Sequence, residues 1–223
     1  MEALSEKGPE TVAAAFVGSV EYPNFARMLG ASAWARLPAA VRARFPAVHG
    51  AEERVCYRGT MQCVRASALG RVLAWIAKLF ETPVAPYTGT EVPTEVMVYP
   101  KPEVNGVVWE RVYHFPGRAP VTVRSTKCLD GAGRLIESLG RGLRMKLTLG
   151  EENGSLRFTS TGYYLELLGV TVHLPDWFPP GVTHVIHTDQ GDGRFRFTMY
   201  TEHPWFGAMF FQEGIFTSRE AGR

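Results

Sequence analysis

Apolar residues recur at every second position beyond Glu95, and this period constrains the fold more than any other feature of the sequence. Runs at 107–115, 143–149 and 194–200 show it clearly. Successive side chains of a strand point to opposite faces of a sheet, so each run predicts a strand with one buried face. Hairpin signals separate the runs, at Asn105-Gly106, Asp130-Gly131, Asn153-Gly154 and Asp192-Gly193.

Short turns imply antiparallel neighbours, because a parallel crossover needs about a dozen residues. We count about nine or ten strands between Val55 and Phe216, with no long helix after Phe80. So many consecutive antiparallel strands must curl. The predicted fold class is α+β: N-terminal helices followed by a strongly curved antiparallel sheet or partly closed β-barrel. We expect a flexible N-terminal segment over 1–23 and one barrel-like domain over 24–218.

The helix signals precede the strands. Asn24 and Gly30 delimit a first helix, Pro38 begins a second over 39–45, and Ser67 caps a third that runs to Phe80. The third helix carries an apolar stripe along one face, formed by Leu69, Val72, Leu73, Ile76 and Phe80. We expect this stripe to dock onto the sheet. The alternative is a basic amphipathic helix that lies on a membrane surface.

Composition excludes several classes of protein. The chain has 24 Lys and Arg against 22 Asp and Glu, a net charge of +2, and no basic–aromatic interleaving, so no nucleic-acid partner is expected. The same balance argues against electrostatic recruitment to a membrane. No transmembrane run and no basic secretory leader is present, so we expect a soluble cytoplasmic protein. Three cysteines without a C-x-x-C pair indicate neither a disulfide scaffold nor a zinc cluster.

Searches for catalytic and cofactor motifs fail. The chain has no G-x-S-x-G, no H-E-x-x-H and no P-loop, and Gly131-Ala132-Gly133 is a turn, with Ile136 at the third position of a dinucleotide fingerprint. His184 and His187 are three residues apart, so on a strand they point to opposite faces and cannot bind one metal ion. We expect no cofactor and no metal.

Arg111 is the most informative single residue. It shares the predicted buried face of its strand with Trp109 and Tyr113, and a guanidinium there needs a partner because an unpaired buried charge is very costly. The partner is either a carboxylate of the protein (Glu95, Glu137, Glu166 or Glu202) or an anionic group of a ligand.

Further ligand-site candidates are aromatic. Phe197 belongs to the apolar face of the run at 194–200, and the proline-rich segment 174–181 carries Trp177 and Phe178. This stiff segment either presents the two rings to a pocket mouth, a partner or a bilayer, or folds back as a cap over the barrel end. The predicted ligand-binding residues are Trp109, Arg111, Tyr113, Trp177, Phe178 and Phe197.

A polar cluster near the C-terminus contains His187, Asp189, Arg196, Tyr200, Glu202 and His203. We interpret it as the solvated outer face of a hairpin, with His114 also outside. In the alternative, His187 with Asp189, or Glu202 with His203, forms an acid–base pair within a cavity.

The order and spacing of several motifs resemble an uncharacterised bacterial family, the domain of unknown function 4166, over roughly Asn24 to Phe216. The motifs are Leu29-Gly30, Leu37-Pro38-x-x-Val41-Arg42, His49-Gly50, Arg58-Gly59-Thr60, Trp109-x-Arg111, Gly154-x-Leu156, Leu168-Gly169-Val170, Leu174-Pro175, Asp192-Gly193-Arg194-Phe195 and Pro204-x-x-Gly207. The resemblance carries over no activity. It implies a small-molecule context, with a reductase resembling saccharopine dehydrogenase as a candidate partner. Trp177, Phe178 and the adjacent prolines look like local elaborations of the family pattern.

Three hypotheses follow. The first is a binder that holds an apolar small molecule, with or without an anionic group, in a barrel-like cavity. The second is a cofactor-independent cyclase, isomerase or lyase that uses the same cavity. The third is a module that docks on a partner or a membrane surface through Trp75, Trp177, Phe178 and Trp205. Ligand identity, catalysis and oligomeric state stay open.

Overall fold

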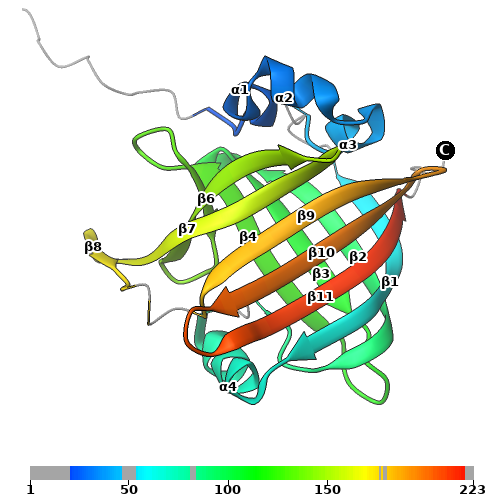
Figure 1. Cartoon of the computed structure of the whole chain (residues 1–223). Coiled ribbons are helices and arrows are strands. Elements are labelled where there is room, and N and C mark those ends of the chain that lie inside the picture. The colour runs from blue at the N-terminus through cyan, green and yellow to red at the C-terminus, as the bar shows by residue number, and fades with distance from the viewer. Residues whose placement is uncertain (1–20, 47–53, 81–83, 176, 178–179, 219–223) are drawn as a thin grey trace, which may run out of the picture.

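The alternating runs of the sequence pair into a closed antiparallel β-barrel (Figure 1). The computed structural model describes residues 21–46, 54–80, 84–175, 177 and 180–218. Its strands are β1 (Val55–Ala66), β2 (Gly89–Lys101), β3 (Gly106–Tyr113), β4 (Val121–Leu129), β5 (Leu135–Ser138), β6 (Leu143–Glu152), β7 (Ser155–Leu167), β8 (Val170–His173), β9 (Val182–Gly191), β10 (Arg194–His203) and β11 (Gly207–Ser218).

Two pairings that are not between consecutive strands close the barrel: β1 with β11, and β7 with β9 across the intervening β8. With the hairpin pairings of the other neighbours, β6 with β7 included, strands β1 to β7 and β9 to β11 form one ring. β8 is an additional strand that pairs with the far end of β7. The predicted curved antiparallel sheet is therefore confirmed, and the closed ring leaves none of its ten strands as a free edge.

The predicted turns are confirmed by the backbone. Asn153-Gly154 joins β6 to β7, and Asp192-Gly193 joins β9 to β10; all four residues have positive φ, between 50° and 76°. Two-residue hairpins of this kind favour Asn-Gly and Asp-Gly, because their twist matches that of the flanking strands. Asn105 is also left-handed and follows a short 3-10 helix, η2 (Pro102–Val104).

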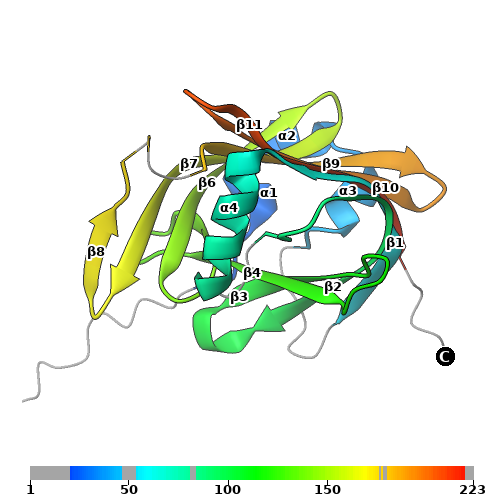
Figure 2. The same cartoon turned by 90° about the horizontal axis from the view of Figure 1, so that it is seen from below.

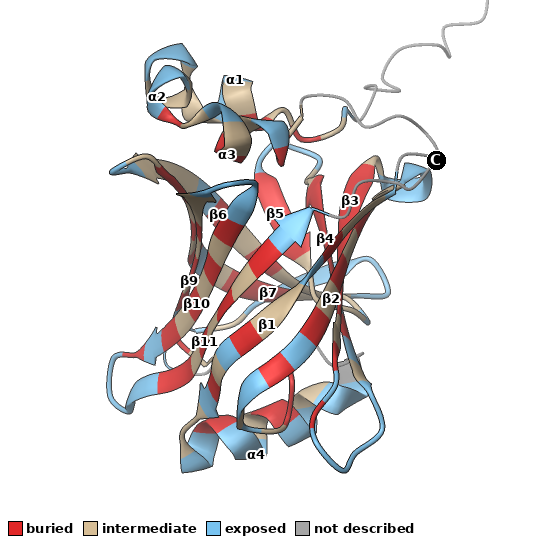
Figure 3. Cartoon of the chain, turned by 90° about the vertical axis from the view of Figure 1, so that its right-hand side faces the viewer, coloured by how far each residue is buried: buried red, intermediate tan, exposed pale blue. Residues whose placement is uncertain are grey.

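Three short helices cover one end of the barrel, where the N-terminal part of the chain lies (Figures 1 and 3). They are α1 (Phe25–Leu29), α2 (Ala31–Arg36) and α3 (Ala39–Ala43). As predicted, Asn24 caps α1, its side-chain oxygen accepting a hydrogen bond from the amide of Arg27. Phe25 and Phe45 are fully buried, and both rings contact Phe158 of β7. The helical segment thus closes this end with aromatic side chains.

The opposite end is covered by α4 (Ala68–Ala77) and the 3-10 turn η1 (Lys78–Phe80) (Figure 2). Ser67 caps α4 as predicted, accepting a hydrogen bond from the amide of Gly70. The predicted docking stripe is right only for Leu73, which packs against the core, and wrong for Val72 and Ile76, which are 55% and 50% exposed. The helix also buries Gly70 and Ala74.

Gly70 explains why α4 turns most of its larger side chains outward. A Cβ at this position would clash with the carbonyl oxygen of Met209 on β11. The same carbonyl accepts a hydrogen bond from the amide of Ser67, so the helix begins in direct contact with the barrel wall. Small residues permit this close approach, and the larger Val72 and Ile76 stay exposed while Leu73 packs against the core. Within the described residues, no helix is long and apolar enough to cross a membrane.

Candidate functional site in the barrel interior

The interior face of β3 is the one that the alternation predicts. Trp109, Arg111 and Tyr113 are all buried, and Arg111 is 8% exposed. Arg111 lies opposite Val96 of β2 and Val123 of β4, both of which are also buried. The strand register therefore places a guanidinium on the apolar inner wall of the barrel.

Arg111 has no hydrogen bond or salt bridge with the described residues. Its Cζ atom lies 5.5 Å from the centre of the Phe197 ring on β10. The carboxylates that the sequence offers as partners are engaged elsewhere or exposed: Glu95 pairs with Arg58, Glu137 with Lys127 and Glu166 with Arg144, while Glu202 is exposed. The structure thus gives the Arg111 charge an aromatic neighbour but no carboxylate in contact.

A buried ion pair lies close to Arg111. Lys127 Nζ of β4 donates a hydrogen bond to a carboxylate oxygen of Glu137 on β5 at 3.0 Å, and both side chains are almost completely buried. Burial disfavours the charged form of Glu137, but the charges of Lys127 and Arg111 outweigh it and lower the pKa of the carboxyl. Burial lowers the pKa of Lys127, and Glu137 opposes this effect. One carboxylate therefore serves two neighbouring cations.

His187 lies inside the barrel, which corrects our interpretation of it as an outer-face residue. It is 4% exposed and pairs in register with Phe197 of the neighbouring strand. Five aromatic rings surround its imidazole at centroid distances of 5.0–6.3 Å: Phe45, Trp109, Phe158, Phe195 and Phe197. The prediction fails because polar residues on β9 line the interior, so polarity does not identify the outer face of this strand.

The environment of His187 keeps its imidazole neutral. Burial places its pKa well below the usual 6.5, and the positive charges of Arg44, Lys127 and Arg111 lower the pKa further. A neutral imidazole has one donor and one acceptor nitrogen. The Nδ1 atom is buried and has no hydrogen-bond partner among the described residues.

The rest of the C-terminal polar cluster divides between locations. Arg196 and Tyr200 are partly exposed on β10, and Glu202 is exposed whereas His203 is buried, so the predicted pair of Glu202 and His203 does not form within a cavity. Asp189 alternates onto the same face of β9 as His187. His184 lies on the other face, bonded to Arg157, as the spacing predicts.

Several buried polar atoms near Arg111 have no partner in the described part of the chain. Besides His187 Nδ1, they include Trp109 Nε1, Asp189 Oδ1 and two guanidinium nitrogens of Arg44. Such atoms are rare in folded proteins, because each costs about 1–3 kcal/mol unless water or a ligand satisfies it. The barrel interior is therefore equipped to form additional hydrogen bonds.

Ring and cation contacts join these groups into one cluster. Trp109 lies 5.6 Å from His187, His187 lies 5.6 Å from Phe197, and Lys127 Nζ lies 5.4 Å from the Trp109 ring. Together with the Arg111–Phe197 contact, these distances define the interior cluster: Trp109, Arg111, Lys127, His187 and Phe197. It presents N–H donors and positive charge within an aromatic wall, which suits an anionic or carbonyl group on an apolar molecule.

Other predicted ligand residues lie outside this cluster. The Tyr113 hydroxyl donates a hydrogen bond to Gln212 Oε1 at 2.8 Å and so has a partner within the barrel. Trp177 is 56% exposed at the α4 end, and Phe178 lies outside the described residues.

Sequence reasoning missed two cations of the interior. Arg44 lies at the end of α3 with its Cζ atom 4.3 Å from the centre of the Phe195 ring. Lys127 could have been found by extending the alternation of β4 from Val123, two positions at a time. Among the described residues, no group of three or more His, Cys, Asp or Glu side chains could hold a metal ion.

Comparison with known proteins gives a family but no activity. Neither a curated protein nor a solved structure matches the chain. A family model described as Domain of unknown function (DUF4166) matches residues 37–216, which include all eleven strands up to Phe216 of β11. The chain belongs to the DUF4166 family.

Proposed function

We propose that the protein binds an apolar small molecule with an anionic group inside the barrel, the anionic group on Arg111. The observation that carries this proposal is the buried Arg111 guanidinium, which has no hydrogen bond or salt bridge with the described residues. Buried charges are costly unless they are compensated, and Glu137, whose charge acts on Arg111, is already hydrogen-bonded to Lys127, so a further anionic partner would compensate Arg111 better. A carboxylate, sulfonate or phosphate would bind the guanidinium bidentately.

The neighbours of Arg111 support the same ligand class. Trp109 offers an unpartnered indole N–H, and Phe197 and the other rings around His187 offer apolar contact. Glu137, the carboxylate next to this cluster, is already bonded to Lys127. The excess of cationic and N–H donor groups favours an anion over a cation.

A pair of probes tests the anion requirement. We expect dodecanoate to bind more tightly than dodecan-1-ol in calorimetric titrations, because the two share an apolar tail and differ in the headgroup charge. In Arg111→Met the ratio of the two affinities should fall by about ten- to a hundredfold, which corresponds to the free energy of a hydrogen bond to a charged group. Native mass spectrometry of protein purified from its own host would then identify the natural ligand.

Arg58→Met is the matched control. It removes the same group from the outer wall, where Arg58 pairs with Glu95 at 3.0 Å and is half exposed, and it should leave the preference unchanged. Equal affinities for the two probes in the wild type, or an unchanged preference in Arg111→Met, would overturn the proposal.

The second candidate is catalysis in the same interior, and His187 specifically favours it. A neutral imidazole with an unpartnered Nδ1 can accept a proton, and Arg111 and Lys127 can stabilise the negative charge that forms. If the co-purified molecule is turned over, His187→Gln should abolish turnover and retain binding. Retained turnover in this variant would exclude His187 as the base.

A further inference from the structure

Exposed apolar side chains concentrate at one end of the barrel. Among the described residues fifteen large hydrophobic side chains are exposed, and nine of them belong to α4, η1 and the segments around Trp177 and the β10–β11 turn. Five of them belong to α4 and η1: Leu69, Val72, Trp75, Ile76 and Leu79. Trp177, Val182 at the start of β9, and Trp205 and Phe206 of the β10–β11 turn supply the other four. We call these nine exposed residues together the α4-end surface. Four more belong to the β7–β8 hairpin, which projects from the side of the barrel (Figure 1). Exposed apolar surface of this extent often marks a protein or membrane interaction site.

The apolar face of α4 is held outward by the contacts of its other face. Gly70 and Ala74 are buried, and the start of the helix is hydrogen-bonded to the Met209 carbonyl. Turning Val72 and Ile76 inward would require the helix to move away from β11. The exposure is therefore built into the packing of α4 across the barrel end (Figure 2).

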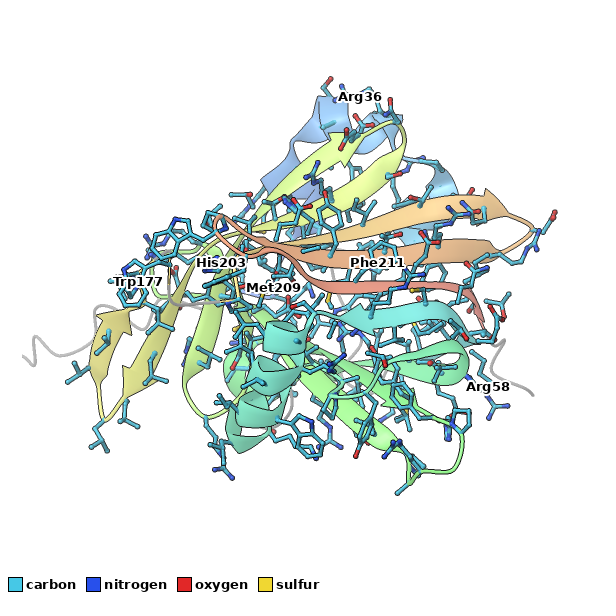
Figure 4. All side chains as sticks on the ribbon, turned by 60° about the horizontal axis from the view of Figure 1, so that its bottom comes forward. Arg36, Arg58, Trp177, His203, Met209 and Phe211 are labelled. Atoms are coloured by element: carbon cyan, nitrogen blue, oxygen red, sulfur yellow. The ribbon has the colours of Figure 1, made fainter. Side chains whose placement is uncertain are left out.

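A second aromatic group is fixed next to this end by His203. Its Nε2 atom lies 3.0 Å from the carbonyl oxygen of Trp177, and its Nδ1 accepts a hydrogen bond from the amide of Trp205. The ring also lies 4.7 Å from Phe206. His203 thus ties the loop before β9 to the β10–β11 turn, and Figure 4 shows Trp177 and His203 side by side. Trp205 and Phe206 are 70% and 58% exposed.

Basic side chains border the apolar ones. Among the residues that the structure describes, the exposed charged ones near this end comprise five basic (Arg65, Arg71, Lys78, Arg118 and Arg141) and two acidic (Glu91 and Glu202), although the whole chain is nearly neutral. The balance predicted from the total composition therefore does not hold locally.

Lys78 and Arg118 flank a surface hollow of about 510 Å³ beside α4. Lys78 Nζ lies 3.9 Å from the centre of the Trp75 ring, and Arg118 Cζ lies 4.3 Å from that of Tyr87. Neither cation has a salt bridge among the described residues. Both are available to an anionic headgroup next to the apolar face.

From these observations we infer that the α4-end surface binds a bilayer that contains anionic phospholipids. α4 lies in the interfacial plane with its apolar face toward the acyl chains, and Lys78 and Arg118 contact phosphate groups. Tryptophan and basic residues are typical of this boundary. Figure 3 shows α4 lying across the outside of this barrel end, where its exposed face can approach a bilayer.

Vesicle sedimentation tests the inference with the full chain. We expect the wild type to bind vesicles of phosphatidylcholine and phosphatidylglycerol in equal parts, and pure phosphatidylcholine vesicles more weakly. The double variant V72E/I76E should lose about tenfold or more in affinity for both, because it places two charges in the apolar layer. K78A/R118A should lose about fivefold in affinity for the mixed vesicles for each charge removed, and its affinity for pure phosphatidylcholine vesicles should not change.

M28E/V104E is the matched control, since it places the same charges on two exposed apolar positions away from this end. It should bind as the wild type does. Thermal unfolding of every variant separates loss of binding from loss of fold. Dodecanoate binding should persist in V72E/I76E, because this inference does not depend on the interior ligand.

Two results would overturn the inference. One is a folded V72E/I76E that sediments with vesicles as strongly as the wild type. The other is a wild type that stays in the supernatant with both kinds of vesicle; loss of self-association in V72E/I76E would then assign the surface to a second copy of the chain.

Discussion

Replacing Arg111 by methionine should stabilise the ligand-free protein, which is the opposite of what removing a structural arginine does. Transferring a guanidinium into a protein interior costs several kcal/mol even after relaxation. The contacts that Arg111 makes in the structure offset only a small part of this cost. The contact with Phe197, at 5.5 Å, is worth about 0.5–2 kcal/mol, and Glu137 is shared with Lys127, which repels Arg111.

Methionine occupies a similar length of the inner wall and brings no charge. We expect Arg111→Met to raise the free energy of unfolding by about 1–3 kcal/mol, in the range measured when buried charges are replaced by apolar residues. For a chain of this size each kcal/mol shifts Tm by about 2–4 °C. Chemical denaturation of the ligand-free protein, extracted under denaturing conditions and refolded, measures the difference.

The control variant Arg58→Met removes an exposed salt bridge and should change stability by less than about 1 kcal/mol. A loss of about 3–5 kcal/mol in Arg111→Met would refute the reasoning, because that is the cost of breaking a buried pair. Arg111 would then be part of the structural network with Glu137, and the case for an anionic ligand would fail.

Three further predictions concern the interior. Phe45→Ala should cost about 3–5 kcal/mol of stability, since it empties the fully buried aromatic contact with Phe158 and Trp109, whereas Met28→Ala on the surface should cost little; equal losses in denaturation curves would contradict this. Glu137→Gln should cost about 3–5 kcal/mol by leaving Lys127 unpaired, and E137L/K127M should recover most of the loss, so a double variant no better than the single one would argue against the pairing. His187 should make stability fall as the pH drops below 6.5, with a slope that approaches about 1.4 kcal/mol per pH unit. The reason is that the unfolded chain protonates His187, whereas the fold lowers the pKa of His187 and keeps it neutral. His187→Gln should lose this part of the pH dependence when denaturation midpoints are measured between pH 6.5 and about 5.

The barrel could be predicted from the sequence because the patterns that indicate it are local. The alternation on β3 and the Asp-Gly and Asn-Gly turns each act over a few residues, and every one agrees with the same antiparallel architecture. The inward position of Arg111 follows from the same alternation. Closure of the ring depends on the pairing of β1 with β11 and of β7 with β9, which are not joined by a short turn, and it could not be predicted in this way.

The orientation of α4 and the inward position of His187 on β9 could not be predicted from the sequence, because either face of each element could have been the buried one. α4 has a stripe of large apolar residues and a stripe of small ones, and packing against Met209 selects the small ones. On β9 the choice was between a polar run as an outer face and a polar run as a barrel lining. Only the register with Phe197 decides it.

Both errors have one physical origin, an inversion of the usual distribution of polarity. The barrel interior holds Arg111, Lys127, Glu137 and His187, while large apolar side chains lie on the outside of α4. Either placement costs stability in water, through desolvated charge inside and hydrated hydrocarbon outside. Binding of a partner to either feature would offset part of its cost. The distribution of polarity therefore supports both proposals, an anionic ligand in the interior and an apolar environment at the α4-end surface, and each can be tested without the other.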